Sequence, residues 1–209
     1  YGNASGGAIL VETEKAIGLP FAELRLTAGD YGYVKPQFKA GGDDGRLNYL
    51  VNLSDTRVDG YREHSEFDNT QFNGRFEYQL HDQGSLLTTL HYTDQPLAND
   101  AGGLTISEVE QDPTQARDRN LLFDAGEALE QTRLGLIYKT RLNAKEEIEA
   151  RVYNTLRDFS NRLPFETGGS VLLDRSFAGG GLKYTRTGQL GGRANRVLVG
   201  LDYDRQDDD

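Results

Sequence analysis

The sequence contains no cysteine, so it can form no disulfide bond and offers neither a thiol nucleophile nor a cysteine ligand to a metal ion. It also lacks an excess of positive charge. Its 209 residues carry a formal net charge of -10, whereas nucleic-acid binding needs clustered Lys and Arg to meet the phosphates. These absences exclude cysteine chemistry and argue against nucleic acid as a partner.

A long apolar run is absent as well, because the longest one, near residues 8–11, is far too short to cross a bilayer as a helix. This does not exclude a membrane protein, since strands of a membrane β-barrel alternate lipid-facing and lumen-facing residues and give a weak hydropathy signal. The chain also starts at Tyr1, without an initiator Met or a secretory signal. We therefore expect an internal part of a longer chain whose targeting signal lies upstream.

Catalytic signatures are missing too, since the sequence has no nucleophile elbow, no His-Glu-x-x-His pattern and no P-loop. The three histidines, His64, His81 and His91, fit a long loop, a tight turn and a strand wall. The run Gly179-Gly180-Gly181 precedes no helical pattern, so we interpret it as a bend in a strand and not as a phosphate cradle. We expect no enzyme activity, no catalytic residue, no metal ion and no cofactor.

What the sequence does contain is alternation with a period of two, repeated along most of the chain. Apolar side chains alternate with polar or charged ones, which places the two kinds on opposite faces of a strand. The pattern indicates about nine strands. They centre on residues 24–28, 33–40, 47–53, 72–80, 86–92, 134–138, 148–152, 182–184 and 197–203. Pro36 cannot donate to a strand ladder, so we place it near a strand end or a bulge.

Short and long connections alternate between these strands. Turn-forming residues make tight links at 42–45, 81–84, 142–145 and 188–192. Long polar links occupy 59–69, 94–130 and 158–175. Two helical turns are expected within the longest link, at 106–111 and 113–119. This sorting is typical of an outer-membrane barrel, which has short periplasmic turns and longer extracellular loops.

The first residues carry the most specific motif. Tyr1-Gly2 and then Gly6-Gly7 precede the short apolar strand at residues 8–11, and these glycines permit tight turns that a side chain would forbid. This stretch resembles the last part of the plug domain in TonB-dependent outer-membrane receptors. In that family a barrel follows the plug at this point, and a long series of alternating strands follows here.

A second stretch resembles the same family. Residues 94–105 are similar to the third extracellular loop of siderophore-type receptors, although Ala101 stands where proline is common. The resemblance covers nearly the whole chain, with 1–16 as the C-terminal end of the plug domain and 17–209 as the N-terminal portion of the barrel. It implies an all-β fold: a partial transmembrane antiparallel β-barrel, with about nine strands of a barrel of about 22.

Such a section cannot stand alone in a membrane. Each unsatisfied backbone group in hydrocarbon costs several kcal/mol, so only closed barrels persist there. We therefore expect further residues beyond both ends of the sequence, and we expect this section to form a curved sheet that does not close.

Charged side chains on the lumen-facing phase of the strands need a polar environment, because burial without partners is costly. In a wide barrel they can face water or a polar plug and pair with one another. The residues concerned are Glu23, Arg25, Arg75, Glu77, Arg133, Lys139, Glu149, Arg151 and Lys183. Besides this structural role, contact with a ligand or the plug is predicted for Arg75, Arg133 and Arg151 in the wall, and for Arg62 and His64 in a long loop.

The resemblance implies a receptor for energised uptake of a scarce nutrient in the bacterial outer membrane, with a ferric siderophore as the leading cargo. The implied partners are outer-membrane lipid, a small-molecule ligand and the TonB energy-transducing complex, which would act through a missing N-terminal segment. Vitamin B12, haem or a quinone cofactor stays open as cargo. A passive outer-membrane channel is the alternative, and a secreted β-protein with a packed core is a third.

Overall fold

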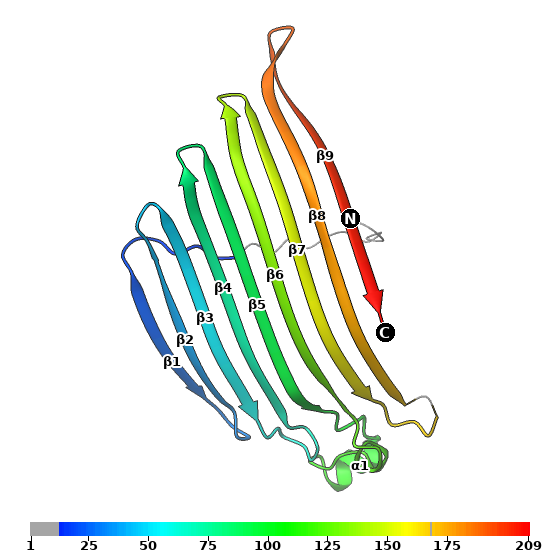
Figure 1. The fold of residues 1–209 in the computed structure, drawn as a ribbon. Coiled ribbons are helices and arrows are strands. Elements are labelled where there is room, and N and C mark those ends of the chain that lie inside the picture. Colours follow the sequence, from blue (N-terminus) through cyan, green and yellow to red (C-terminus); the bar gives the residue numbers. More distant parts are fainter. Residues whose placement is uncertain (1–12, 168) are drawn as a thin grey trace.

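The computed structural model describes residues 13–167 and 169–209, which form one antiparallel sheet (Figure 1). Nine strands lie side by side in the order of the chain, so every connection is a hairpin. The strands are β1 (Phe21–Ala28), β2 (Val34–Asp43), β3 (Leu47–Val58), β4 (Phe67–His81), β5 (Gly84–Asn99), β6 (Gly126–Asn143), β7 (Glu146–Arg162), β8 (Ser170–Leu190) and β9 (Arg193–Asp208). The predicted all-β class and the number of strands are confirmed. The plug motif with Tyr1, Gly2, Gly6 and Gly7 lies outside the described residues.

The period of two in the sequence gives the sheet two chemically different faces. Along each strand one phase is mainly apolar and forms what we name the outer face, and the other is rich in charge and forms the inner face. The register keeps the phases aligned from strand to strand. One outer row joins Phe38, Leu53, Phe72 and Tyr92, whereas the adjacent inner row joins Lys39, Asn52, Asn73 and His91.

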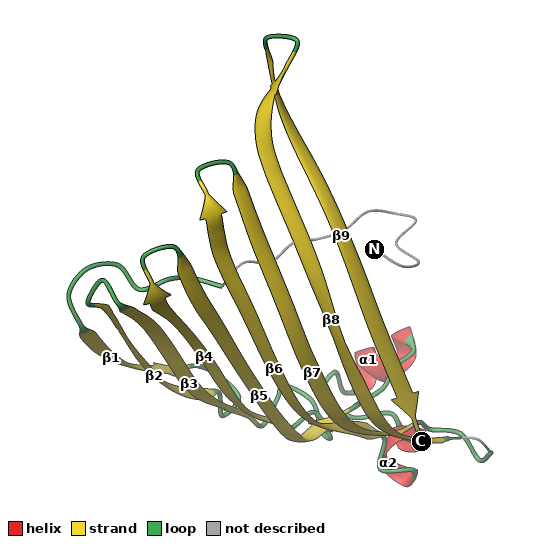
Figure 2. Ribbon diagram, turned by 45° about the horizontal axis from the view of Figure 1, so that its top comes forward, coloured by secondary structure: helices red, strands yellow, loops and turns green. Residues whose placement is uncertain are grey.

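The outer face has no cover within the part of the chain that the structure describes. Leu24 is 83% exposed and Leu201 is 75% exposed, and the buried apolar residues are four alanines, mostly in loops. The sheet is curved and open, since β1 and β9 pair with one neighbour each (Figure 2). The expectation of a curved, unclosed sheet is confirmed, and a packed core of the kind that a secreted β-protein needs is not found among these residues.

The connections sort by length to the two ends of the sheet (Figure 1). Tight turns lie at the upper end in that view. In the first of them Asp44 accepts hydrogen bonds from the backbone of Arg46 and Leu47, at 2.9 and 2.7 Å, and Gly45 takes a φ of 84°. In the last, Gly191 and Gly192 both have positive φ, which glycine adopts at little cost. The lower end carries the three longer connections and the five-residue link 29–33 between β1 and β2, and we name it the loop end.

The strands extend further into the loop end than the sequence predicts. The three long connections span 59–66, 100–125 and 163–169, instead of 59–69, 94–130 and 158–175. The polar composition misled the prediction, because neighbouring strands supply backbone partners whatever the side chains are. Pairing of β5 with β6, for example, continues to Asn99 opposite Gly126. Pro36 lies two residues into β2 and is paired with β1 but not β3, near a strand end as expected.

Two short helices lie in the longest connection. Helix α1 (Ile106–Gln111) matches its prediction and starts with a capping box, in which Thr105 and Glu108 satisfy each other's backbone N–H groups. Helix α2 (Asp118–Leu122) begins later than the predicted 113–119, because Asp112 and Thr114 form a turn that occupies the start of that stretch. No helix among the described residues is long and apolar enough to cross a membrane.

Candidate functional site

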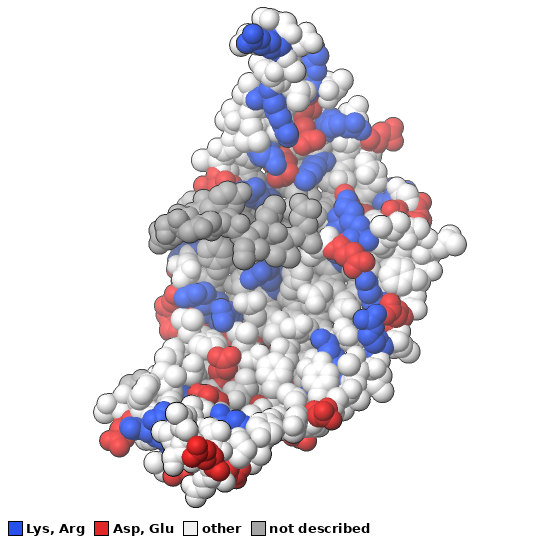
Figure 3. Space-filling view, turned by 180° about the vertical axis from the view of Figure 1, so that it is seen from behind, with Lys and Arg blue, Asp and Glu red and all other residues white. Residues whose placement is uncertain are grey.

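The inner face carries charges of both signs, and they pair with one another as the sequence predicts. Figure 3 views the molecule from the side opposite to Figure 1 and shows positive and negative side chains interspersed. Glu149 of β7 lies at the centre of one cluster, with its side chain 9% exposed. Its carboxylate is 3.2 Å from the ammonium of Lys139 on β6 and 2.9 Å from that of Lys183 on β8. Two partly exposed lysines, one on each neighbouring strand, thus neutralise the nearly buried carboxylate of Glu149.

Arg75 and Arg151 each form ion pairs with carboxylates on the inner face. Arg75 is 6% exposed and bonds to Glu77 at 2.7 Å. Arg151 lies 2.6 Å from Asp202 on β9 and 3.8 Å from Glu149. Because each guanidinium already has a partner, the structural role predicted for both is present. Their contact with a ligand or a plug stays a prediction.

Arg133 is held less strongly by its neighbours on the inner face. Its Nε donates to Thr155 Oγ1 at 3.3 Å, and no ion pair holds it within the described residues. It lies in register with His91, which bonds to Asn73 at 2.7 Å. Of the three arginines on the inner face predicted to contact ligand or plug, Arg133 is the exposed one, whereas Arg151 is partly buried and Arg75 is buried.

The residues just before β1 are attached to the inner face. Lys15 bonds to Glu77 at 2.8 Å and Glu14 to Lys39 at 2.7 Å. The carbonyl of Ala16, a residue only 5% exposed, accepts a bond of 2.9 Å from Asn48. A groove of about 260 Å³ opens beside this segment and is lined by the wall residues around Arg75 and His91. The inner face therefore receives the chain segment that the sequence assigns to the end of the plug.

The two loop residues of the predicted site both lie in the first long connection, and both bond to the second long connection. Arg62 donates to three backbone carbonyls of the connection 100–125. His64, with a side chain 11% exposed, bonds to the carbonyl of Ala125 at 2.7 Å. Both are far along the sheet from the wall arginines, so the structure divides the predicted residues into a loop group and an inner-face group.

Carboxylates at the loop end are held ionised by short local hydrogen bonds. The amide of Asn99 holds the pKa of Glu66 below its usual value. Backbone and hydroxyl donors of Thr105 likewise lower the pKa of Glu108 at the start of α1. The hydroxyl and backbone N–H of Thr114 lower the pKa of Asp112. These bonds order the second connection at neutral pH, because the ionised carboxylate is the better acceptor.

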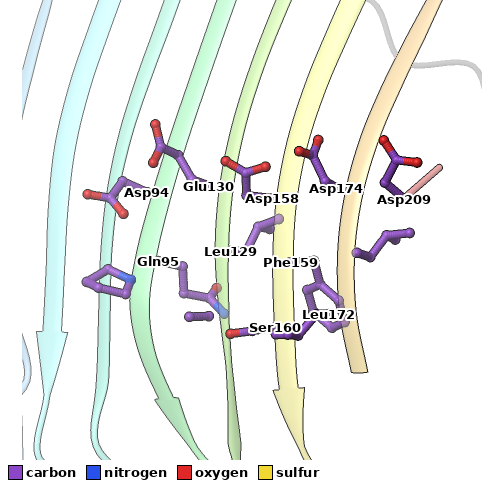
Figure 4. A pocket seen from close by; sticks show the side chains of 13 residues that line it. Asp94, Gln95, Leu129, Glu130, Asp158, Phe159, Ser160, Leu172, Asp174 and Asp209 are labelled. Carbon is purple, nitrogen blue, oxygen red and sulfur yellow. The ribbon is translucent and has the colours of Figure 1, made fainter. Parts of the chain in front are cut away.

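An acidic row on the outer face is a feature that the sequence analysis missed. Carboxylates on five adjacent strands lie in register, and we name them the acidic row: Asp94, Glu130, Asp158, Asp174 and Asp209 (Figure 4). They border a shallow groove of about 440 Å³. No ion pair neutralises them within the described part of the chain. The row depends on register across five strands, and no local sequence signal could have revealed it.

The net negative charge of the chain also gathers at the loop end. Residues 59–69, 94–130 and 158–175 together contain 16 acidic and five basic residues, whereas the remainder contains 17 acidic and 18 basic. The rest of the chain is therefore nearly neutral overall. Among the residues that the structure describes, no group of three or more His, Asp or Glu side chains is arranged to hold a metal ion.

Comparisons with known proteins define the class of the fold. No family model matches the sequence. Solved structures do match, and they give the described residues the fold of one section of larger proteins of known structure.

Two particular structures illustrate the match. The ferric citrate transporter FecA, in its unliganded form, matches with a TM-score of 0.68 and 20% identity over 88% of this chain. FpvA of P. aeruginosa, bound to heterologous pyoverdines, matches with a TM-score of 0.67 and 10% identity over 90% of this chain. In each case the chain spans 28% of the length of the solved protein. At these identities the similarity establishes the fold, and function must be argued from the site.

Proposed function

We propose that this chain is part of a TonB-dependent receptor of the bacterial outer membrane that takes up a scarce nutrient, with a ferric siderophore as cargo. The observation that carries the proposal is the pairing of an exposed apolar outer face with a charged inner face on a curved, open sheet. Lipid suits the first face, and a wide aqueous or plugged lumen suits the second. The fold match to a ferric citrate transporter supports the same assignment.

The segment before β1 supports a plug inside this barrel. Glu14 and Lys15 pair with the inner face and not with the loop end or the outer face. A chain arriving at β1 from within the lumen would leave contacts of this kind. Residues 1–16 are accordingly proposed as the end of a plug and 17–209 as barrel. The plug distinguishes this proposal from a passive channel, which needs no such segment.

Energy for uptake must reach the outer membrane from elsewhere, since that membrane has neither a nucleotide pool nor an ion gradient of its own. The proposed partner is the TonB complex, acting on residues upstream of Tyr1. The proposed ligand contacts are Arg133 and the other wall arginines on the inner face. Vitamin B12, haem and quinone cofactors are the alternative cargoes, because the wall charges do not by themselves select one chelate.

A transport experiment tests the proposal. The intact receptor is produced in a strain that lacks its own uptake receptors, and cells are supplied with radiolabelled ferric citrate, ferric pyoverdine, haem or vitamin B12. We expect uptake of one ferric chelate, abolished by a protonophore or by loss of TonB, together with recovery of the receptor in the outer-membrane fraction. Uptake that persists without energy would support the passive channel, and recovery in a soluble fraction would overturn the membrane assignment altogether.

A further inference from the structure

Arg62 has an unusual set of partners for an arginine in an extracellular loop. Its Nε donates to the carbonyl of Gln115 at 3.0 Å, its Nη1 to that of Gly102 at 2.5 Å and its Nη2 to that of Ala101 at 3.0 Å. All three nitrogens of the guanidinium thus serve carbonyl groups of a different connection. The partners lie 39 to 53 residues away in sequence.

One of these carbonyls has a second donor. The backbone N–H of Arg117 donates to the carbonyl of Ala101 at 2.8 Å, within the second connection itself. Gly102 and Gln115 lie in irregular, partly buried stretches of backbone, where Arg62 is the donor that their carbonyls meet. A buried carbonyl without a donor costs free energy comparable to a lost hydrogen bond. Arg62 therefore supplies, from the first connection, a donor for the carbonyls of Gly102 and Gln115 and a second donor for that of Ala101.

Further bonds join the same two connections. The backbone N–H of Glu63 donates to Thr114 at 2.8 Å. His64 reaches the carbonyl of Ala125 at 2.7 Å, and it does so with a φ of 57°, a conformation uncommon for a residue with a side chain. The backbone N–H of Asn99 donates to Glu66 at 3.0 Å. The contact between the connections thus extends over residues 62–66 and includes a strained residue that the contact holds in place.

The end of β7 is attached to the same body. Arg162, at the end of β7, donates through Nε to the carbonyl of Asp124 at 2.7 Å, and its Nη2 lies 2.8 Å from the carboxylate of that residue. The connection 100–125 is therefore fixed from both sides. The first two long connections and the end of β7 are joined through it, and we name this body the rim.

We propose that Arg62 is a positioning residue that joins the first two connections into one rim, and that it acts on cargo through the shape of the rim and not by touching the cargo. The inference rests on the proposed function, because it assumes that cargo enters at the loop end. It departs from the direct ligand contact that the sequence predicts for this residue. Because the connections form one rim, these loops do not close over cargo independently of one another.

The test begins with Arg62→Ala in the intact receptor, purified in detergent. Hydrogen–deuterium exchange should show loss of protection in residues 100–125, with the strands unchanged. If the rim then holds its competent arrangement in about a tenth of molecules, affinity for the ferric chelate falls about tenfold while the transport rate at saturation is kept. Arg57→Ala is the matched control, since Arg57 is an exposed arginine of the adjoining strand whose ion pair stays within β3. It should change neither quantity.

A covalent rescue separates positioning from contact. This chain has no cysteine of its own, so Glu63→Cys and Thr114→Cys can be joined selectively. A backbone hydrogen bond holds these two segments about 5 Å apart, within the reach of a disulfide or a short maleimide cross-linker. In the Arg62→Ala receptor, this cross-link should restore both the protection of residues 100–125 and the affinity for ferric citrate or ferric pyoverdine, whichever the unaltered receptor binds.

Two results would overturn the inference. Protection restored by the cross-link without recovery of affinity would mean that Arg62 contacts the cargo itself. Unchanged protection of residues 100–125 in Arg62→Ala would mean that the rim does not depend on it. A receptor that binds neither ferric chelate before any substitution contradicts the proposed function instead, and the exchange measurement still decides whether Arg62 holds the rim together.

Discussion

Arg151 on β7 bonds to Asp202 on β9 at 2.6 Å, across the intervening strand β8. The register places Gly181 of β8 between them. A Cβ at this glycine would collide with the carboxylate of Asp202 and press on the guanidinium of Arg151. The same arrangement recurs one row along, where Tyr153 bonds to Asp204 across Gly179. The glycines leave room for bonds between next-nearest strands, a role that the predicted bend in the strand did not include.

Replacing Gly181 by alanine should therefore weaken the sheet. We expect Gly181→Ala to lower the free energy of unfolding by about 1 kcal/mol, a modest figure because both partners are partly exposed. The measurement is urea unfolding of the purified protein. Gly200→Ala is the control, since a Cβ there makes only an ordinary contact of 3.5 Å. If the cost of Gly181→Ala is the same when Asp202 is already alanine, the bridge is not its cause.

Glu149 should be the most sensitive carboxylate of the inner face. Substitution by glutamine keeps the shape but leaves Lys139 and Lys183 facing each other without a shared counter-charge. We expect a loss of about 1–2 kcal/mol, reduced from the value for a fully buried pair because Lys139 is 52% exposed. Chemical unfolding measures it. Glu147→Gln, two residues earlier on the same face, should cost much less, and equal losses would show that Glu149 has no special role.

Acid should loosen the connection 100–125 before it affects the strands. The pKa of Glu108 lies below its usual value of 4.5 because Thr105 donates to the carboxylate, and that of Asp112 lies below 3.8 because of Thr114. A lowered pKa in the folded state means stability that is complete above the unfolded pKa and is lost as pH falls through the folded pKa. The protection of α1 amides against hydrogen exchange should thus fall as the pH drops below about 4.5. In Thr105→Ala this protection should already be weaker at neutral pH and should fall less with acid; an unchanged profile would contradict the capping role.

Neutralising one member of the acidic row should stabilise the sheet. Like charges directly opposite on neighbouring strands destabilise, and Glu130 lies between Asp94 and Asp158. We expect Glu130→Gln to raise the free energy of unfolding by about 0.5 kcal/mol, and the gain should shrink in high salt. Asp82→Asn, which removes a charge from a tight turn, serves as the comparison. A loss of stability in Glu130→Gln at low salt would show that repulsion along the row is not significant.

Under the proposed function, the rate at which an anionic ferric chelate binds should depend on salt, because the loop end is negatively charged. With 16 acidic and five basic residues there, an anionic ferric chelate should associate faster as salt screens the repulsion. Glu110→Gln with Asp118→Asn should give a similar acceleration at low salt, about twofold to threefold. Stopped-flow association with ferric citrate measures both. The paired substitutions Asp82→Asn and Glu147→Gln remove the same charge far from the loops and should leave the rate unchanged.

The strands and turns of this protein follow from its sequence, because they depend on neighbours in the chain. Alternation around residues 197–203 predicts β9, glycines at 191–192 predict its turn, and α1 begins where Thr105 and Glu108 make a capping box. The true length of the connections had no such signal, since Thr93, Asp94 and Gln95 of β5 are all polar and interrupt the alternation.

The pairings that make the site were decided only by the tertiary structure. Arg62 meets carbonyls about 40 residues away, and Arg151 meets Asp202 across a strand that happens to carry glycine. Such contacts depend on register, in which a shift of a single residue would turn every side chain to the opposite face. Alternation determines that each strand has a charged face and an apolar face. Which charges meet, and which residues hold the loops together, is determined by the alignment of nine strands through their backbone hydrogen bonds.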